Sequence, residues 1–141
     1  MGLFDKLKKA VLKTEDEVLL TEALIAVSFA DGDDQWEESE LIKAYLRTLP
    51  ELKDKDVYEI YEKAEKNVKL HGALSRVKEL GKLGTPALKH KCFLLSLDLA
   101  LSSGDVDDGE EAVLAAMQET LGISDADAQR YADVLQVKYT T

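Results

Sequence analysis

Two points in the chain constrain the fold most, because at each an apolar helical pattern stops at a glycine and acidic residues follow. The first reads FADGDDQWEESELI around Gly32, and the second reads LSSGDVDDGEEAVL around Gly104, 72 residues later. Each glycine is followed by Asp at the next position and by Glu six positions on. These residues are Asp33 and Glu38, then Asp105 and Glu110. The repeat predicts two helical hairpins of similar design in one bundle.

Apolar residues at helical spacing continue through most of the chain, and its 141 residues suit one domain. We therefore expect an all-α single domain of about seven helices, preceded by a short amphipathic segment over 1–13 and filling 14–141. The expected helices span 17–30, 35–48, 57–70, 73–80, 86–102, 108–121 and 125–137.

Capping residues precede several of these helices. The expected caps are Asp54 or Asp56, Thr85 with Pro86 behind it, Asp107 with Glu110 as its capping-box partner, and Ser124. The run CFLLSLDLAL is apolar on nearly every side, so we expect it to form the buried central helix. The tail KYTT is expected to fray.

Asp98 is unusual because it lies inside that apolar run. A buried carboxylate needs a partner, a proton or a metal ion. Acids at the start of the next helix, such as Glu110, would raise its energy unless a cation joined them. Asp98 is therefore either a metal ligand or a structural acid, and a structural acid would form either a buried salt bridge to Lys or Arg or a hydrogen bond with a Tyr hydroxyl.

The acidic corners also have two readings. Hard cations such as Ca²⁺ and Mg²⁺ take several carboxylate oxygens, which favours a divalent-cation site with no organic cofactor. The expected ligands are Asp31, Asp33 and Glu38 at one corner and Asp98, Asp105, Asp107 and Glu110 at the other. Helix capping and the helix dipole explain the same acids without a metal. The EF-hand pattern fails, because counting from Asp31 puts Trp36 sixth and Ile42 twelfth.

Charge is unevenly distributed in a chain whose formal net charge is −10. Residues 98–133 carry ten acids against Arg130 alone, whereas residues 1–13 have a net charge of +3. The acidic surface disfavours nucleic acid and suits cations or a basic protein partner. Trp36, beside the first corner, either covers the core or contacts a partner. The basic segment 1–13 either docks on the bundle or makes a peripheral contact with an anionic membrane.

The compartment is expected to be cytoplasmic and reducing. Cys92 is the single cysteine, which excludes an internal disulfide. The start MGLFDKLKKAVLK carries charges where a signal peptide is apolar, and no run is long enough to span a membrane. No nucleophile elbow or phosphate loop is present, so we expect no enzymatic activity.

Four stretches together resemble the tellurite-resistance protein TerB family. They are the start MGLFDKLKKA, the phrase FADGDDQWEESEL, the stretch SLDLALSSGDVDDGEEAVL and the ending LGISDADAQRYADVLQVKY. Asp31, Gly32 and Glu38 match the first copy of the family's repeated motif. Asp98, Gly104 and Glu110 match the second.

The resemblance implies an all-α fold of two repeated bundles and an acidic surface that binds divalent metal. It also implies a role in resistance to tellurite and other stresses, near membrane-associated partners at the inner face of the membrane. One departure is Ser103, which stands where the family has the Asp of Ala-Asp-Gly. Serine is a poor ligand for a hard cation, so we expect Asp105 and Asp107 to compensate at that corner.

Overall fold

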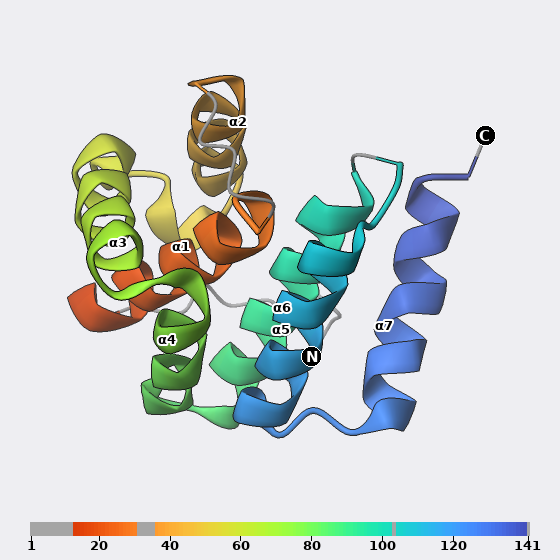
Figure 1. The fold of residues 1–141 in the computed structure, drawn as a ribbon. Coiled ribbons are helices and arrows are strands. Elements are labelled where there is room, and N and C mark those ends of the chain that lie inside the picture. Colours follow the sequence, from red (N-terminus) through yellow and green to blue (C-terminus); the bar gives the residue numbers. More distant parts are fainter. Residues whose placement is uncertain (1–12, 31–35, 103, 141) are drawn as a thin grey trace, which may run out of the picture.

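The computed structural model describes residues 13–30, 36–102 and 104–140, without the side chains of Trp36 and Glu37 (Figure 1). Within these ranges every regular element is helical, which confirms the all-α fold. The α-helices are α1 (Thr14–Ser28), α2 (Trp36–Arg47), α3 (Val57–His71), α4 (Ala73–Lys78), α5 (Pro86–Leu101), α6 (Asp108–Leu121) and α7 (Asp125–Lys138). Two short 3₁₀ helices, η2 (Pro50–Leu52) and η3 (Glu79–Lys82), lie between them.

The helix starts follow the capping signals. Asp56 caps α3 by accepting from the backbone N–H groups of Tyr58 and Glu59, which decides between Asp54 and Asp56. The hydroxyl of Thr85 accepts from Leu88 at 3.1 Å at the start of α5, and Ser124 does the same for α7. The other helix bounds lie within three residues of those expected, whereas the expected helix over 73–80 is divided, because its last turn tightens into η3.

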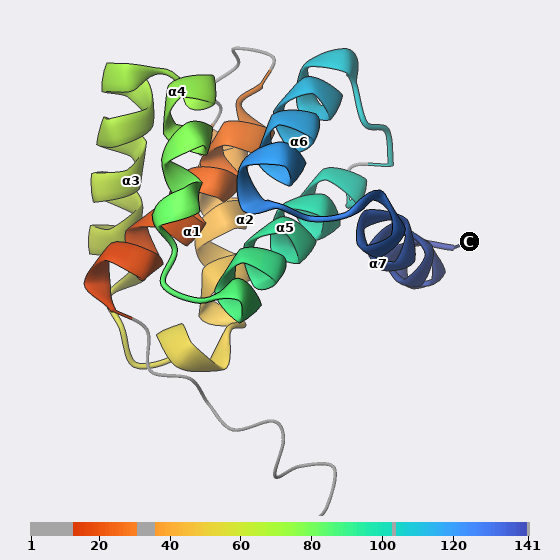
Figure 2. The same cartoon turned by 90° about the horizontal axis from the view of Figure 1, so that it is seen from below.

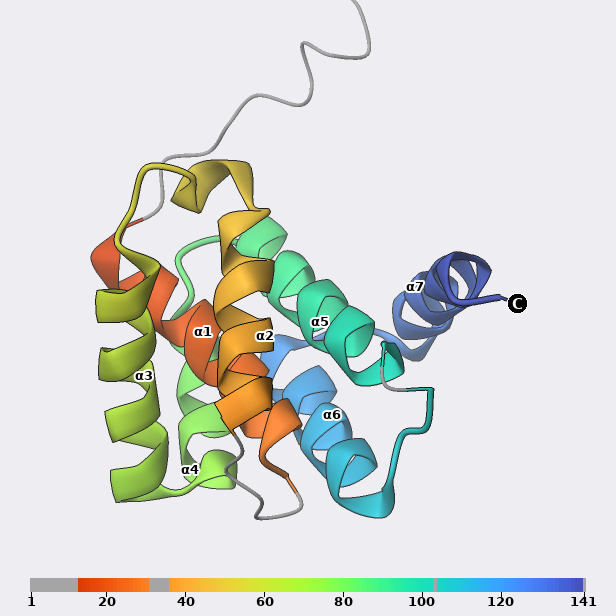
Figure 3. The same ribbon diagram turned by 90° about the horizontal axis from the view of Figure 1, so that it is seen from above.

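The central helix is α1, and the expectation that the run containing Cys92 would form it was wrong. All of α1 from Asp16 to Val27 is buried except Val18, and α1 contacts α2, α3, α4, α5 and α6 (Figure 3). Leu94, Leu95 and Leu97 of α5 are only partly buried. The helix α5 lies at the edge of the main body and is covered on its outer side by α7. The buried acids Asp16, Glu17 and Glu22 make the sequence of α1 less apolar than that of a typical buried helix, which is why the sequence did not indicate its central position.

The last helix, α7, stands to one side of the bundle in Figures 2 and 3 and packs mainly on α5. Leu135 is the one residue of α7 that is buried. Polar contacts add to this attachment: the hydroxyl of Tyr131 lies 2.7 Å from Nδ1 of His90, and Nε2 of Gln118 donates to Asp125 at 2.8 Å. None of the described helices is long and apolar enough to cross a membrane.

Candidate functional site at the acidic corners

The first corner, residues 31–38, joins α1 to α2. Asp31 and Asp33 lie outside the described residues, so their assignment as ligands stays a prediction. Trp36 begins α2, and its side chain lies outside the described part as well. Glu38 lies in the first turn of α2 and is partly buried. The structure therefore places the helix ends of this corner and leaves its proposed ligands Asp31 and Asp33 untested.

The second corner, residues 98–110, joins α5 to α6, and its backbone reverses at Gly104 with φ +90°. Asp107 caps α6 by accepting from the backbone N–H of Glu110 at 2.7 Å. The carboxylate of Glu110 accepts in return from the backbone N–H of Asp107 at 3.4 Å. This is the predicted capping box, so both side chains have a structural role whether or not an ion binds. Asp105 is exposed.

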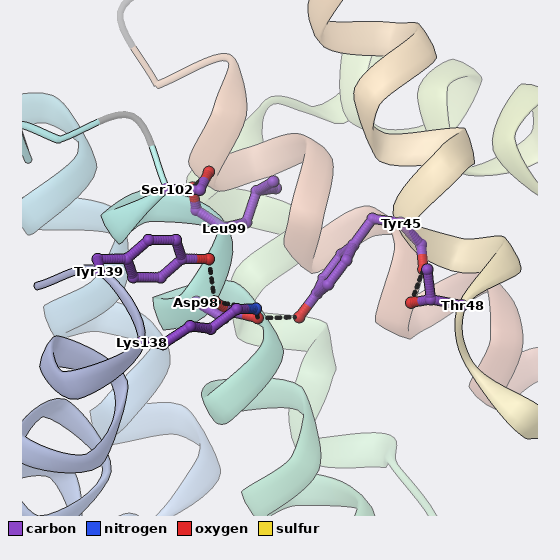
Figure 4. Close-up of polar contacts among 7 residues, drawn as sticks. All are labelled: Tyr45, Thr48, Asp98, Leu99, Ser102, Lys138 and Tyr139. Carbon is purple, nitrogen blue, oxygen red and sulfur yellow. Dashed lines mark hydrogen bonds and ion pairs between the residues drawn. The ribbon is translucent and has the colours of Figure 1, made fainter. Parts of the chain in front are cut away.

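Asp98 does not join these acids, because its carboxylate faces the other way, toward α2 and α7 (Figure 4). It accepts from the hydroxyl of Tyr45 on α2 at 2.8 Å, from Nζ of Lys138 at 3.0 Å, and from the hydroxyl of Tyr139. We call these four residues the Asp98 cluster. Its geometry matches the non-metal reading of Asp98 and unites the two alternatives of that reading, since a salt bridge to a lysine occurs together with hydrogen bonds from tyrosines.

The cluster also changes the expected behaviour of the tail. Tyr139 is partly buried and bonded to Asp98, so the expectation that KYTT frays was wrong for Lys138 and Tyr139. Asp98 itself is 7% exposed. Three donors from two other segments thus hold a nearly buried carboxylate, and the same contacts fix the last turn of α7 against α5.

The electrostatics of the cluster favour an ionised Asp98. Burial alone would raise the pKa of this carboxyl, but hydrogen bonds from Tyr139, Tyr45 and Lys138 outweigh it, so the pKa lies below its usual value. Burial and the hydrogen bond to Asp98 raise the pKa of the Tyr45 hydroxyl. The hydrogen bond to Asp98 also raises the pKa of Lys138. Each donor therefore keeps its proton at neutral pH, and Asp98 stays charged.

Ala30, the last described residue before the first corner, meets the start of α6. A Cβ added to Gly109, in the first turn of α6, would lie 3.1 Å from the carbonyl oxygen of Ala30. Ala30 directly precedes Asp31 in the sequence, and Gly109 stands between Asp108 and Glu110. Two segments that are 79 positions apart are thus in backbone contact, and glycine permits this approach. We call this meeting point the corner junction.

Next to the corner junction lies a groove of about 560 Å³. Its walls come from the end of α1, the α3–α4 turn and the start of α6. The lining residues are Phe29, Ala30, His71, Gly72, Ala73, Leu74, Ser75, Gly109, Ala112 and Val113. Most of these side chains are apolar or small, and Leu74 is 52% exposed. An apolar groove therefore adjoins the start of α6, where Asp108 and Glu110 flank Gly109 in the sequence.

Among the residues that the structure describes, no group of three or more His, Cys, Asp or Glu side chains is arranged to hold a metal ion. Asp98 is engaged with α7, and Asp107 with Glu110 forms the cap. Asp31 and Asp33 of the first corner lie outside the described residues. A complete ligand set would have to draw on them.

Sequence reasoning missed four further buried acids: Asp16, Glu17, Glu22 and Glu51. Each has a distant partner: the Gly84 backbone for Asp16, Lys55 for Glu17, Arg76 for Glu22 and Lys91 for Glu51. For Asp16, Glu17 and Glu22 the signal was present in TEDEVLLTEALIAV, where acids interrupt a run that is too apolar to lie at the surface. The identity of each partner was not readable there.

Comparison with known protein families shows to which family the chain belongs. The family described as "Tellurite resistance protein TerB" matches residues 17–133. This chain belongs to the TerB family. Comparisons with curated proteins and with solved structures gave no significant match. The matched range includes both corners of this TerB domain and Tyr45, but Lys138 and Tyr139 lie beyond it. Family membership supports a tellurite-resistance-related domain.

Proposed function

We propose that this TerB domain acts without catalysis in resistance to tellurite and related stress, by binding a divalent cation at the corner junction. The carrying observation is the backbone contact between Ala30 and Gly109. It places Ala30, which precedes Asp31 in the sequence, against the first turn of α6, which carries Asp108 and Glu110. Ions such as Ca²⁺ and Mg²⁺ need oxygen ligands from several residues, and we propose that both segments supply them. A cation there would neutralise clustered acids and stiffen both helix ends.

The proposed ligands come from both segments. Asp31, Asp33 and Glu38 supply the first corner, and Asp105, Asp107 and Glu110 the second. Asp107 uses Oδ1 for its cap, so its second oxygen can still face an ion. Asp98 is different, because Lys138 contacts both of its oxygens at 3.2 and 3.0 Å. A metal at Asp98 would have to displace a lysine and break the cluster, so we assign Asp98 to the attachment of α7.

Emission from Trp36, the single tryptophan, tests the cation directly. The chelator-treated protein is titrated with Ca²⁺, then Mg²⁺ and Mn²⁺, and its melting temperature is followed in parallel. We expect a saturable change in emission and a raised melting temperature, both reversed by chelator and both lost in Asp31→Asn. The matched control is Asp133→Asn, an exposed acid on α7. Absence of any change at millimolar metal in both measurements would contradict the cation.

A second candidate is docking of a basic, amphipathic segment of a partner protein. It is favoured by the groove next to the corner junction, where Phe29, Leu74 and Val113 offer an apolar surface beside the acids. A partner helix with apolar side chains on one face and lysines on the other would fit both features. In this reading the domain works in the cytoplasm, and residues 1–13 add a peripheral contact with the inner face of the membrane.

The two candidates separate in one experiment. A basic amphipathic peptide is titrated in the presence of chelator against the natural protein and against Leu74→Glu. Binding that survives chelator and is weakened by Leu74→Glu supports docking, whereas binding that requires Ca²⁺ supports the cation. Sedimentation with anionic liposomes, with and without residues 1–13, tests the membrane contact. Equal sedimentation of both proteins would remove the role of that segment.

A further inference from the structure

A second cleft of about 550 Å³ lies away from the corner junction, between α1, α3, α4 and η3. Figure 2 shows α3 and α4 beside each other, with α1 next to both. The cleft is lined by Thr14, Glu15, Val18, Leu19, Glu22, Lys63, Lys66, Asn67, Arg76 and Lys82. Its volume is within the range of small-molecule sites, roughly 300–1,000 Å³.

The charge of this cleft is opposite to that of the chain as a whole. Four lining residues are basic and two, Glu15 and Glu22, are acidic, whereas the protein carries a formal net charge of −10. Glu22 is 1% exposed and is neutralised by Arg76, so the acid that remains at the cleft surface is Glu15. Lys63 and Lys82 pair with glutamates that lie outside the lining, so Lys66 is the cation that a ligand would meet without a competing ion pair among the described residues.

Arg76 is held in a fixed orientation at this cleft. Its Nε donates to Oε1 of Glu22 and its Nη2 donates to Oε2 at 3.1 Å, which is a two-point pairing with a buried carboxylate. A guanidinium has five N–H groups, and these bonds use two of them. The hydrogen bonds of the described residues give the other three no acceptor. The outer edge of the guanidinium thus reaches the cleft already positioned, which lowers the entropic cost of binding an anion.

The other cations surround the same space. Lys66 on α3 is exposed and forms no ion pair with any residue in the described ranges. Lys63 pairs with Glu59 at 3.5 Å and Lys82 pairs with Glu79, both along their own helical segments. Exposed pairs of this kind contribute little, so they exchange readily for a ligand. Val18 and Leu19 add an apolar part to the lining.

We propose that this cleft binds a small organic anion, a carboxylate or phosphate group attached to a short apolar body. Arg76 and Lys66 contact the anionic group, with Lys63 and Lys82 nearby. Val18 and Leu19 contact the apolar body. The proposal is independent of the cation at the corner junction, because the two sites share no lining residue.

The test uses the full chain and two probes, hexyl phosphate and hexanoate, followed by amide chemical shifts and by calorimetry. We expect saturable shifts confined to α1, α3, α4 and η3. Lys66→Ala should weaken binding by about tenfold, the usual cost of losing a charge-assisted hydrogen bond. Lys53→Ala is the matched control, since Lys53 is also exposed but lies outside the cleft. Arg76 is left intact here because its removal would orphan buried Glu22.

The arms of the experiment separate the parts of the proposal. Tighter binding of hexyl phosphate than of hexanoate identifies a phosphate ligand, and the reverse identifies a carboxylate. Equal affinity for inorganic phosphate and hexyl phosphate would overturn the role of Val18 and Leu19. Equal weakening by Lys66→Ala and Lys53→Ala, or no shift with either probe at millimolar concentration, would overturn the site itself.

Discussion

Glu22 and Asp98 are both nearly buried carboxylates on apolar helices, yet they are satisfied in different ways. Glu22 lies on α1, the helix that most others cover, and pairs with one arginine. Asp98 lies on α5 and accepts from two tyrosines and a lysine, two of which come from the last turn of the peripheral helix α7. The Glu22 pair is therefore part of the core, whereas the Asp98 cluster joins one helix to it.

The comparison shows that burial alone does not indicate whether a charged residue stabilises the whole fold or the attachment of a single helix. The Glu22 pair affects global unfolding, because the buried carboxylate on α1 becomes fully hydrated only when the helices packed on α1 separate. A pair at the edge of the core affects local opening of the element that it attaches. The two carboxylates should accordingly respond to substitution in different measurements.

The largest effect is expected from Arg76→Met, which leaves Glu22 buried and unpaired. We expect a loss of about 2–3 kcal/mol in the free energy of unfolding, somewhat below the full cost for a completely buried pair, because Arg76 is partly exposed. Urea denaturation measures it. The double variant with Glu22→Met should recover most of the loss, since no buried charge remains. A double variant as unstable as the single one would contradict the explanation.

A smaller and local effect is expected from Asp98→Asn. The neutral side chain keeps the volume but loses the charge-assisted bonds from Lys138, Tyr139 and Tyr45, at a cost of about 1–2 kcal/mol. Hydrogen exchange should become faster in α7 while α1 keeps its protection. Asp133→Asn, on the exposed side of α7, serves as the control. Equal loss of protection in α1 and α7 would make the Asp98 cluster part of the core.

Acid should act on the same cluster with a definite sign. The pKa of Asp98 is lower in the folded protein than its ordinary value, about 3.9. Its contribution is therefore fully present above the unfolded pKa and is lost as the pH falls through the folded pKa. Thermal melts between about pH 5 and pH 2 should show the natural protein losing its advantage over Asp98→Asn. A constant difference at all pH values would contradict this role.

The smallest expected effect is on the rate at which the Cys92 thiol is modified. This rate distinguishes global opening of the core from local opening of α7. The thiol is 1% exposed and burial raises its pKa to about 12, so it should react very slowly with thiol reagents at pH 8. Asp98→Asn should leave this rate nearly unchanged, because α7 can open while the core stays closed. Arg76→Met should increase it. A large increase in Asp98→Asn would mean that α7 protects the core.

The features that could be predicted from the sequence are those that depend on residues close together in the chain. Four helices begin directly after the predicted N-caps Asp56, Thr85, Asp107 and Ser124, whose hydrogen-bond partners lie two or three positions further along the chain. The partners of the buried acids could not be read in this way, because Tyr45 is 53 positions from Asp98 and Arg76 is 54 positions from Glu22. The packing of helices alone decides such pairs.

The candidate site shows the same division. The acids of both corners and the capping box were visible in the sequence as a repeat. The separation of Asp98 from the other acids was not, because it depends on Lys138 and Tyr139, which α7 brings back to α5. The corner junction was hidden as well. Gly109 looked like an ordinary residue of a first helical turn, and only packing revealed its contact with Ala30.

That contact has a consequence for how substitutions combine. Glycine inside a helix costs about 1 kcal/mol relative to alanine, so Gly109→Ala would normally be favourable. Here the added methyl group meets the carbonyl of Ala30, and the outcome depends on whether that carbonyl can move. Changes on either side of the contact should therefore be epistatic: a double-mutant cycle between Gly109 and the end of α1 should depart from additivity. The effects of substitutions at the end of α1 and at the start of α6 would then depend on one another, although these two segments are far apart in the sequence.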